Sequence, residues 1–260
     1  MAAADHMSME GRHALVTGGG RGIGLAIARR FAERGARVSL IGRTQSSLAA
    51  AHEAHALGGG VAAADVSDVK AVEDAVDALC ADHGPIDTVV NNAGAAESAP
   101  FKSTGADLWN RMIAVNLTGT FNVTRAALKG LTDAPAGRVI NVASTASLKG
   151  YAYVSAYCAA KHGVLGLTRA LALELARTAV TVNAICPGFT ETDLLKGSIE
   201  KIAEASSLSA EDARAELVSV NPQGRFIDPD EVAETALWLC SDAARSITGQ
   251  AITLAGGEVM

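Results

Sequence analysis

The sequence lacks a membrane span and a basic surface. No apolar run approaches the ~18–20 residues needed to cross a bilayer, so we expect no membrane association. The 22 Lys and Arg residues are outnumbered by 28 Asp and Glu, which gives a net charge of −6. Nucleic acid binds to clustered basic residues, so this balance predicts no nucleic-acid partner.

Cysteine is scarce and widely spaced, which excludes a disulfide framework. The sequence has no C-x-x-C pair, and neither its cysteines nor its six histidines follow a metal-ligand spacing. We therefore predict no metal site and a reducing, cytoplasmic compartment. The cysteines are Cys80, Cys158, Cys186 and Cys240.

Short apolar runs alternate with amphipathic stretches from Arg12 to the end of the chain. Several runs are almost continuously apolar, as strands buried on both faces are. Repeated strand and helix patterns predict an α/β fold: a three-layer, doubly wound (Rossmann) sheet of seven parallel strands. The expected strands are 13–18, 37–42, 60–66, 86–92, 138–144, 180–188 and 250–257.

No linker composition divides the chain, so 11–260 is expected to form one domain. The opening, 1–10, reads as a disordered or cloning-derived tail. Helices are expected at 24–35 and 228–241, the second with a capping box of Asp228 and Glu231 around Pro229. The polar stretch 190–222 predicts a helical insertion, of the kind that forms lids or binding loops.

A glycine-rich turn follows the first strand and leads into a helix. Gly18, Gly22 and Gly24 let the backbone approach a phosphate, and the helix N-terminus favours its charge. A site for NAD would carry an acid at the end of the second strand, but Arg43 stands there and Arg21 lies in the turn. Two cations attract a 2′-phosphate, so we expect NADP, with NADPH preferred over NADH.

Two further groups fall at carboxyl ends of expected strands. The fourth strand ends in Asn91-Asn92-Ala93-Gly94 and the fifth in Ser144, where ligands bind in open parallel sheets. Tyr157 and Lys161 lie four apart, so they share one face of a helix. Such a pair also occurs by chance in helices, and Ser144 alone would be an ordinary turn residue.

Taken in order, these motifs make the chain resemble the single-domain short-chain dehydrogenase/reductase family over essentially its whole length, most closely its 3-oxoacyl-thioester reductases. The resemblance implies an NAD(P)-dependent enzyme acting on CH–OH and C=O groups. It implies a catalytic set of Asn116, Ser144, Tyr157 and Lys161. The implied cofactor-binding residues are Gly18, Arg21, Gly22, Ile23, Gly24, Arg43, Asp65, Val66, Asn92, Ala93, Gly94, Tyr157, Lys161, Pro187, Gly188 and Thr190.

Charge gives the Tyr157 and Lys161 pair a chemical role. A nearby ammonium, helped by an oxidised nicotinamide, is expected to lower the phenol pKa from about 10. Tyr157 would then move the proton while the nicotinamide carries the hydride, with Ser144 fixing the substrate oxygen. The family pattern adds that Lys161 contacts the ribose and that Asn116 holds a water for proton relay.

The substrate is predicted to be a ketone with an aliphatic or acyl arm, and a 3-oxoacyl thioester of ACP or CoA is the leading candidate. Against an acidic carrier, the acidic chain has no evident basic patch. The alternatives are a dehydrogenase of a small secondary alcohol or hydroxyacid and, remotely, a non-catalytic NADP-sensing module. The family pattern also implies a homotetramer that pairs the helices at 107–127 and 164–175. The expected pocket comprises Ala95, Ala96, Thr145, Ala146, Leu148, Tyr151, Phe189, Leu194 and Leu195.

Overall fold

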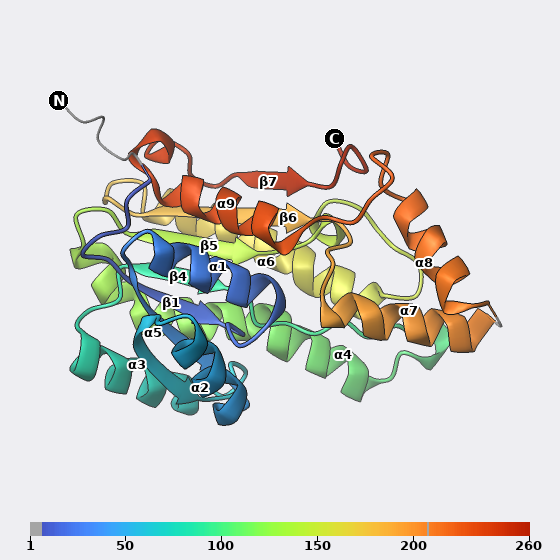
Figure 1. Ribbon diagram of the computed structural model, residues 1–260, viewed down its shortest axis with the longest axis horizontal. Helices are drawn as coiled ribbons and strands as arrows, with labels where there is room; N and C mark the ends of the chain where they lie inside the picture. The colour runs from blue at the N-terminus through green and yellow to red at the C-terminus, as the bar shows by residue number, and fades with distance from the viewer. Residues whose placement is uncertain (1–6, 207) are drawn as a thin grey trace.

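The computed structural model describes residues 7–206 and 208–260 and shows one seven-stranded sheet (Figure 1). The strand order is β3-β2-β1-β4-β5-β6-β7, and every neighbouring pair is parallel. This confirms the predicted doubly wound fold. The strands are β1 (His13–Thr17), β2 (Arg37–Gly42), β3 (Gly58–Ala63), β4 (Thr88–Asn91), β5 (Arg138–Val142), β6 (Thr181–Pro187) and β7 (Ala251–Leu254).

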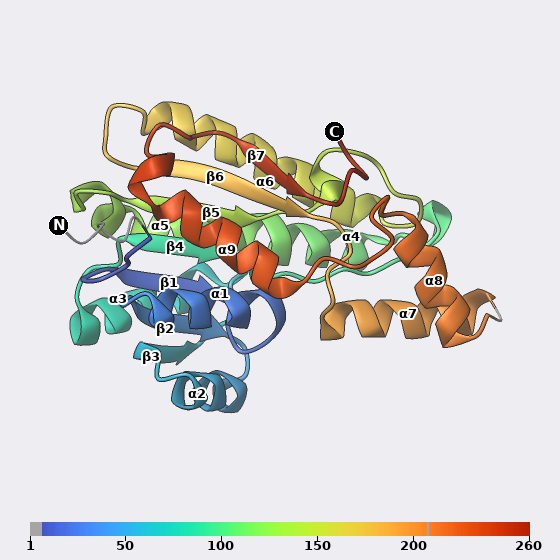
Figure 2. The same cartoon turned by 45° about the horizontal axis from the view of Figure 1, so that its top comes forward.

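Helices cover both faces of the sheet (Figure 2). One apolar cluster packs α1, α2 and α9 on one face, and a second packs α3, α5 and α6 on the other. Because β1 lies between β2 and β4, the crossovers diverge on either side of it, which opens a crevice at the carboxyl ends of β1 and β4. The helices are α1 (Gly22–Glu33), α2 (Gln45–Ala54), α3 (Val69–His83), α4 (Ala106–Ile113), α5 (Gly119–Asp133), α6 (Ser155–Glu174), α7 (Asp193–Ser206), α8 (Ala210–Ser219) and α9 (Pro229–Cys240).

The two expected helices form with small shifts at their ends. The first begins at Gly22 instead of residue 24 and ends before Gly35, whose φ of +92° suits glycine. At the start of α9, the Asp228 side chain accepts a hydrogen bond from the Asp230 N–H, and the Glu231 side chain accepts one from the Asp228 N–H. The predicted capping box is therefore confirmed.

The insertion at 190–222 is helical, as predicted. It forms α7 and α8, whose Leu195, Ile199 and Ala213 share one apolar cluster with Phe226, which follows the insertion. Both helices extend past the carboxyl end of the sheet, at the same end of the molecule as the C-terminus (Figures 1 and 2). The insertion is therefore placed beside the crevice.

Two sequence-based boundaries need correction. Residues 1–6 of the expected tail lie outside the described residues, but Met9 is 1% exposed and its N–H donates to the Arg34 carbonyl. The packed chain therefore includes residues assigned to the tail. The third strand, expected at 60–66, runs from Gly58 to Ala63, so Asp65 and Val66 lie in the loop that follows it. Within the described residues, no helix is long and apolar enough to cross a membrane.

Candidate active site

The glycine turn after β1 is tightly closed. Gly18 has a φ of +65°, and a Cβ on Gly24 would lie 2.6 Å from the Gly18 carbonyl oxygen. A Cβ on Gly24 would also lie 2.4 Å from Nδ2 of Asn92, which donates to the Thr17 carbonyl at 2.9 Å. Side chains at these glycines would therefore displace the turn. The N-cap Arg21 makes no side-chain cap hydrogen bond, so the N–H groups of the first turn of α1 keep the capacity to bind a phosphate.

Thr17 joins this turn to the end of β4, a role that sequence reasoning missed. Its Oγ1 accepts hydrogen bonds from the N–H groups of Asn92 (3.0 Å) and Ala93 (2.9 Å). A hydroxyl at the end of a first strand carries no spacing signal that distinguishes it from an ordinary β-branched strand residue. These two hydrogen bonds nevertheless fix the Asn91–Gly94 segment against the glycine turn.

The predicted adenosine end lies at the carboxyl ends of β2 and β3. Arg21 and Arg43 are both exposed there. Hydrogen bonds from the side chain and backbone of Ser67, together with the charge of Arg43, lower the pKa of Asp65. The Val66 carbonyl is held by Asn122 Nδ2 at 2.9 Å. Two exposed cations beside a fixed loop fit a phosphorylated ribose.

Asn116 lies in a π-helical turn, Ala114–Thr118, instead of the regular helix that the sequence indicated. It is 1% exposed, and its Nδ2 donates to the carbonyls of Met112 (3.0 Å) and Ala95 (2.9 Å). Its Oδ1 accepts from the Ala95 N–H at 3.2 Å. The widened turn thereby replaces backbone pairing with side-chain bonds, a feature frequent at functional sites.

Gly94 shows how close Asn116 and Lys161 come. A Cβ placed on Gly94 would lie 2.7 Å from Oδ1 of Asn116 and 3.8 Å from Nζ of Lys161. The expected proton-relay partners therefore both lie next to Gly94.

Ser144, Tyr157 and Lys161 meet at the end of β5. Ser144 caps the short 3-10 turn Thr145–Ser147, where its hydroxyl accepts a hydrogen bond from the Ala146 N–H at 3.1 Å, and it lies beside Tyr157. Tyr157 and Lys161 both project from α6, and the Lys161 Nζ lies 5.8 Å from the centre of the Tyr157 ring. The sequence-predicted catalytic residues therefore form one cluster.

Burial dominates the electrostatics of this cluster. It lowers the pKa of Lys161 to about 8. It also raises the pKa of Tyr157, although the Ser144 hydrogen bond acts in the opposite direction. The pKa of Tyr157 is thus raised, opposite to what was expected from Lys161, because desolvation by burial outweighs the Ser144 hydrogen bond. A protonated phenol at neutral pH is suited to donate a proton.

The segment after β6 closes the crevice from above the glycine turn. The Gly188 N–H donates to the Leu254 carbonyl at 2.9 Å, and Thr190 Oγ1 donates to the Gly188 carbonyl at 3.0 Å. Further along, the Thr192 methyl group lies 3.3 Å from where a Cβ on Gly22 would stand. A side chain at Gly22 would fill the space between the glycine turn and the segment after β6. Glycine leaves this space open, so the residues present fit a dinucleotide.

An aromatic wall stands beside Ser144. The rings of Tyr151 and Phe189 meet edge to face, with their centres 6.4 Å apart, and the Tyr151 hydroxyl bonds Thr145 Oγ1 at 2.6 Å. Leu195, expected in the pocket, is instead buried between α7 and α8. This expectation is wrong because the helical periodicity of the insertion turns Leu195 toward its own small core.

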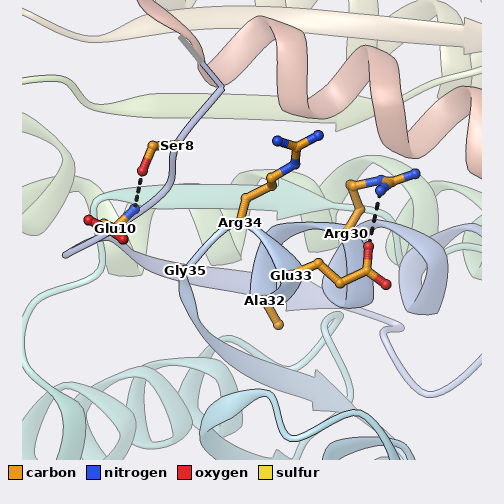
Figure 3. A pocket seen from close by; sticks show the side chains of 7 residues that line it. All are labelled: Ser8, Glu10, Arg30, Ala32, Glu33, Arg34 and Gly35. Carbon is orange, nitrogen blue, oxygen red and sulfur yellow. Dashed lines mark hydrogen bonds and ion pairs between the residues drawn. The ribbon is translucent and has the colours of Figure 1, made fainter. Parts of the chain in front are cut away.

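A separate hollow lies at the opposite, amino end of the sheet (Figure 3). It is bordered by the N-terminal segment and the end of α1, with an ion pair of 3.1 Å between Arg30 and Glu33. It contains none of the predicted site residues. Within the described residues, no group of three or more His, Cys, Asp or Glu side chains is arranged to hold a metal ion.

Comparisons with known proteins agree with this geometry. The family model for short chain dehydrogenases matches residues 12–203. A D-beta-hydroxybutyrate dehydrogenase of Cupriavidus necator is 42% identical, with 96% of this chain and 99% of the relative aligned. A 3-oxoacyl-[acyl-carrier-protein] reductase of Vibrio harveyi is 39% identical over 98% of this chain and 100% of its own.

Solved structures give the same result. A variant of actinorhodin polyketide ketoreductase with NADPH superposes with a TM-score of 0.91 at 37% identity. That match covers 98% of this chain and 99% of the ketoreductase. The arrangement of the sheet and crevice is therefore shared with a protein whose structure includes NADPH.

Proposed function

Because the chain belongs to the short-chain dehydrogenase/reductase family, we propose that it reduces a 3-oxoacyl thioester with NADPH, using Tyr157 as the acid. The family makes the protein an oxidoreductase acting on CH–OH and C=O groups. The thioester, the preference for NADPH and the residue roles are the proposal.

One observation carries the proposal: Tyr157 projects from α6 beside the Ser144 hydroxyl, and the Lys161 ammonium on the next turn lies 5.8 Å from the centre of the phenol ring. Two hydroxyls in that arrangement can both reach one carbonyl oxygen. Tyr157 is the stronger candidate for proton transfer, because a phenol is far more acidic than the Ser144 alcohol.

Each residue of the cluster then has a defined task. NADPH, when bound, supplies a hydride to the carbonyl carbon of the substrate. Tyr157 gives its proton to the carbonyl oxygen, and Ser144 donates a hydrogen bond that keeps this oxygen in place. Lys161 holds a ribose hydroxyl and replaces the proton on Tyr157, and a water held by Asn116 relays protons to Lys161. In the oxidative direction, Tyr157 accepts the proton instead.

The preference for NADPH rests on charge at the adenosine end. Arg21, in the glycine turn, and Arg43, directly after β2, are both exposed cations. No acid follows β2 to accept a ribose hydroxyl, since Gly42 is followed by Arg43 and Thr44. A 2′-phosphate would therefore be attracted there.

The 3-oxoacyl thioester is supported by relatives and by the aromatic wall. The relatives include the 3-oxoacyl-[acyl-carrier-protein] reductase and an acetoacetyl-CoA reductase of Shinella zoogloeoides, which is 39% identical. Tyr151 and Phe189 offer an apolar surface for an acyl arm. The second candidate is oxidation of a small hydroxyacid, which the 42% identity to D-beta-hydroxybutyrate dehydrogenase favours.

A matched panel of substrates tests the proposal. Oxidation of NADPH is followed with acetoacetyl-CoA, with a longer 3-oxoacyl thioester on CoA and on acyl carrier protein, and with acetoacetate. Reduction of NAD⁺ and NADP⁺ is followed with 3-hydroxybutyrate. The proposal expects the highest kcat/KM for a thioester with NADPH. A higher kcat/KM for 3-hydroxybutyrate with NAD⁺ would replace it by the second candidate.

A further inference from the structure

A buried carboxylate stands behind the aromatic wall. The side chain of Glu258 is 2% exposed and accepts a hydrogen bond from the Tyr151 hydroxyl. The Lys149 Nζ lies 3.0 Å from its Oε1 and also 4.8 Å from the centre of the Tyr151 ring. One acid from the C-terminal tail therefore contacts both polar groups of the segment that follows Ser144.

The backbone of the tail dictates this position. Gly256 and Gly257 have φ values of +59° and +95°, so the chain reverses at once after β7. A Cβ on Gly256 would lie 1.9 Å from Oδ1 of Asn221, at the end of the insertion. A Cβ on Gly188 would lie 3.0 Å from Oε2 of Glu258. The carboxylate is thus fixed where the insertion, the segment after β6 and the Tyr151 wall meet.

All but one of the cations around this wall are paired with an acid. The described segments 92–100, 144–161 and 187–196, which border the crevice, contain three cations. Lys149 is paired with Glu258, Lys161 donates to the Val142 carbonyl at 2.8 Å, and Lys196 lies 3.7 Å from Asp193.

One cation on each of two adjoining helices is paired as well. Arg111 on α4 bonds Glu97 at 3.0 Å, and Arg214 on α8 bonds Glu191 at 2.8 Å. Among these groups only Lys161, next to Tyr157, has no acid partner. A substrate carboxylate at the wall itself would therefore meet a paired Lys149 and the buried charge of Glu258.

From this juxtaposition we infer that Glu258 determines specificity: it cancels the charge of Lys149 and so excludes substrates that carry a free carboxylate beside the reacting ketone. The inference rests on the proposed function and narrows its substrate class to thioesters and other uncharged derivatives. A carboxylate that leaves water without a cationic partner is strongly disfavoured, whereas a thioester carbonyl carries no charge.

The test compares acetoacetate with its ethyl ester, which have the same ketone and differ in charge. The measured quantity is the ratio of kcat/KM for the acid to kcat/KM for the ester, with NADPH. Glu258→Gln keeps the shape of the side chain and releases Lys149 from its ion pair. We expect this ratio to rise about tenfold or more, with kcat/KM for the ester changed little.

Two variants show whether Lys149 is responsible. The double variant Lys149→Met/Glu258→Gln should return the ratio to its wild-type value. The single variant Lys149→Met leaves Glu258 without its cation and should lower the ratio. It replaces Glu258→Gln as the test if that variant does not fold. Glu234→Gln, which breaks a surface ion pair with Arg30, is the matched control and should leave the ratio unchanged.

An unchanged ratio in folded Glu258→Gln, or a rise that persists in the double variant, would overturn the inference. If Glu258→Gln does not fold, an unchanged or higher ratio in Lys149→Met would do so. The proposed function is tested by a separate measurement, the reduction of acetoacetyl-CoA by wild-type enzyme. It fails if wild-type enzyme reduces no thioester. The ratio for the acid and ester pair can be measured in either case, because it depends on no thioester.

Discussion

The Nζ atom of Lys161 lies 2.8 Å from the carbonyl oxygen of Val142, the last residue of β5. The lysine is 5% exposed, and burial lowers its pKa to about 8. An ammonium is therefore kept inside the protein with one neutral acceptor, next to Tyr157. Such an arrangement opposes folding at neutral pH, which indicates that it serves the reaction.

We expect Lys161→Met to stabilise the chain at pH 7 while it removes activity. The variant avoids the cost of a buried charge, about 3 kcal/mol for this shift. It loses one hydrogen bond, worth about 1 kcal/mol. The expected net gain in free energy of unfolding is on the order of 1–3 kcal/mol, measured by urea denaturation without nucleotide.

The gain should depend on pH with a defined sign. Between pH 8 and 10.5 the unfolded chain keeps a proton on Lys161 that the native chain has lost, so wild-type stability rises with pH. The advantage of the variant should therefore shrink across this window. Lys102→Met, which removes an exposed lysine, is the control. The account of Lys161 would be refuted if Lys161→Met were less stable than the wild type at pH 7. It would also be refuted if the difference in free energy of unfolding did not change with pH.

Arg43→Asp tests the assignment of the adenosine end. An acid in place of the cation should repel a 2′-phosphate and can accept a ribose hydroxyl. We expect KM for NADPH to rise about 10–100-fold, the range of a charge-assisted hydrogen bond, while KM for NADH changes little or falls. Arg177→Asp makes the same charge change at an exposed site outside the crevice. Equal effects on both nucleotides would show that Arg43 does not read the phosphate.

Asn116→Ala tests the π-helical turn. The change removes the bonds to Met112 and to both backbone groups of Ala95, which leaves buried polar groups unpaired. We expect a loss of stability of about 1–3 kcal/mol and a lower kcat with NADPH binding kept. Asn110→Ala, at an exposed position of α4, should change neither quantity. Full kcat in a destabilised variant would limit Asn116 to a structural role.

Large apolar side chains remain exposed on the helices that the family pattern pairs. Trp109 of α4 is 41% exposed, Phe121 of α5 is 46% and Leu173 of α6 is 81%. We predict a homotetramer, measured by light scattering, in which Leu173→Glu halves the mass. Val69→Glu, on α3, is the control, since Val69 is exposed outside the expected interface. A monomeric mass for the wild type would contradict this prediction.

The sequence predicts the sheet well because nearly every strand is a short apolar run between clear turn signals. It also predicts which residues meet, because carboxyl ends of parallel strands share one edge and an i, i+4 pair shares a helix face. Ser144, Tyr157 and Lys161 are brought together for these two reasons alone.

Other features depend on packing that no local pattern encodes. The π-turn at Asn116 follows from its bonds to Ala95, which is distant in sequence. The pKa of Tyr157 is raised by burial. The i, i+4 spacing of Tyr157 and Lys161 in the sequence shows only that an ammonium is near the phenol. Glu258 was missed because an acid near a chain end reads as a solvated charge until the tail is seen to fold back.

The proton donor is the central claim, and Tyr157→Phe tests it most directly, because the change removes one hydroxyl and keeps the ring. Single-turnover oxidation of NADPH by acetoacetyl-CoA, with nucleotide binding measured on the same samples, separates chemistry from binding. We predict a rate lower by about 10²–10⁴-fold, the usual contribution of general acid catalysis, with the Kd for NADPH within about twofold of the wild type. A variant that keeps more than about a tenth of the wild-type rate would contradict the role of Tyr157 as the acid.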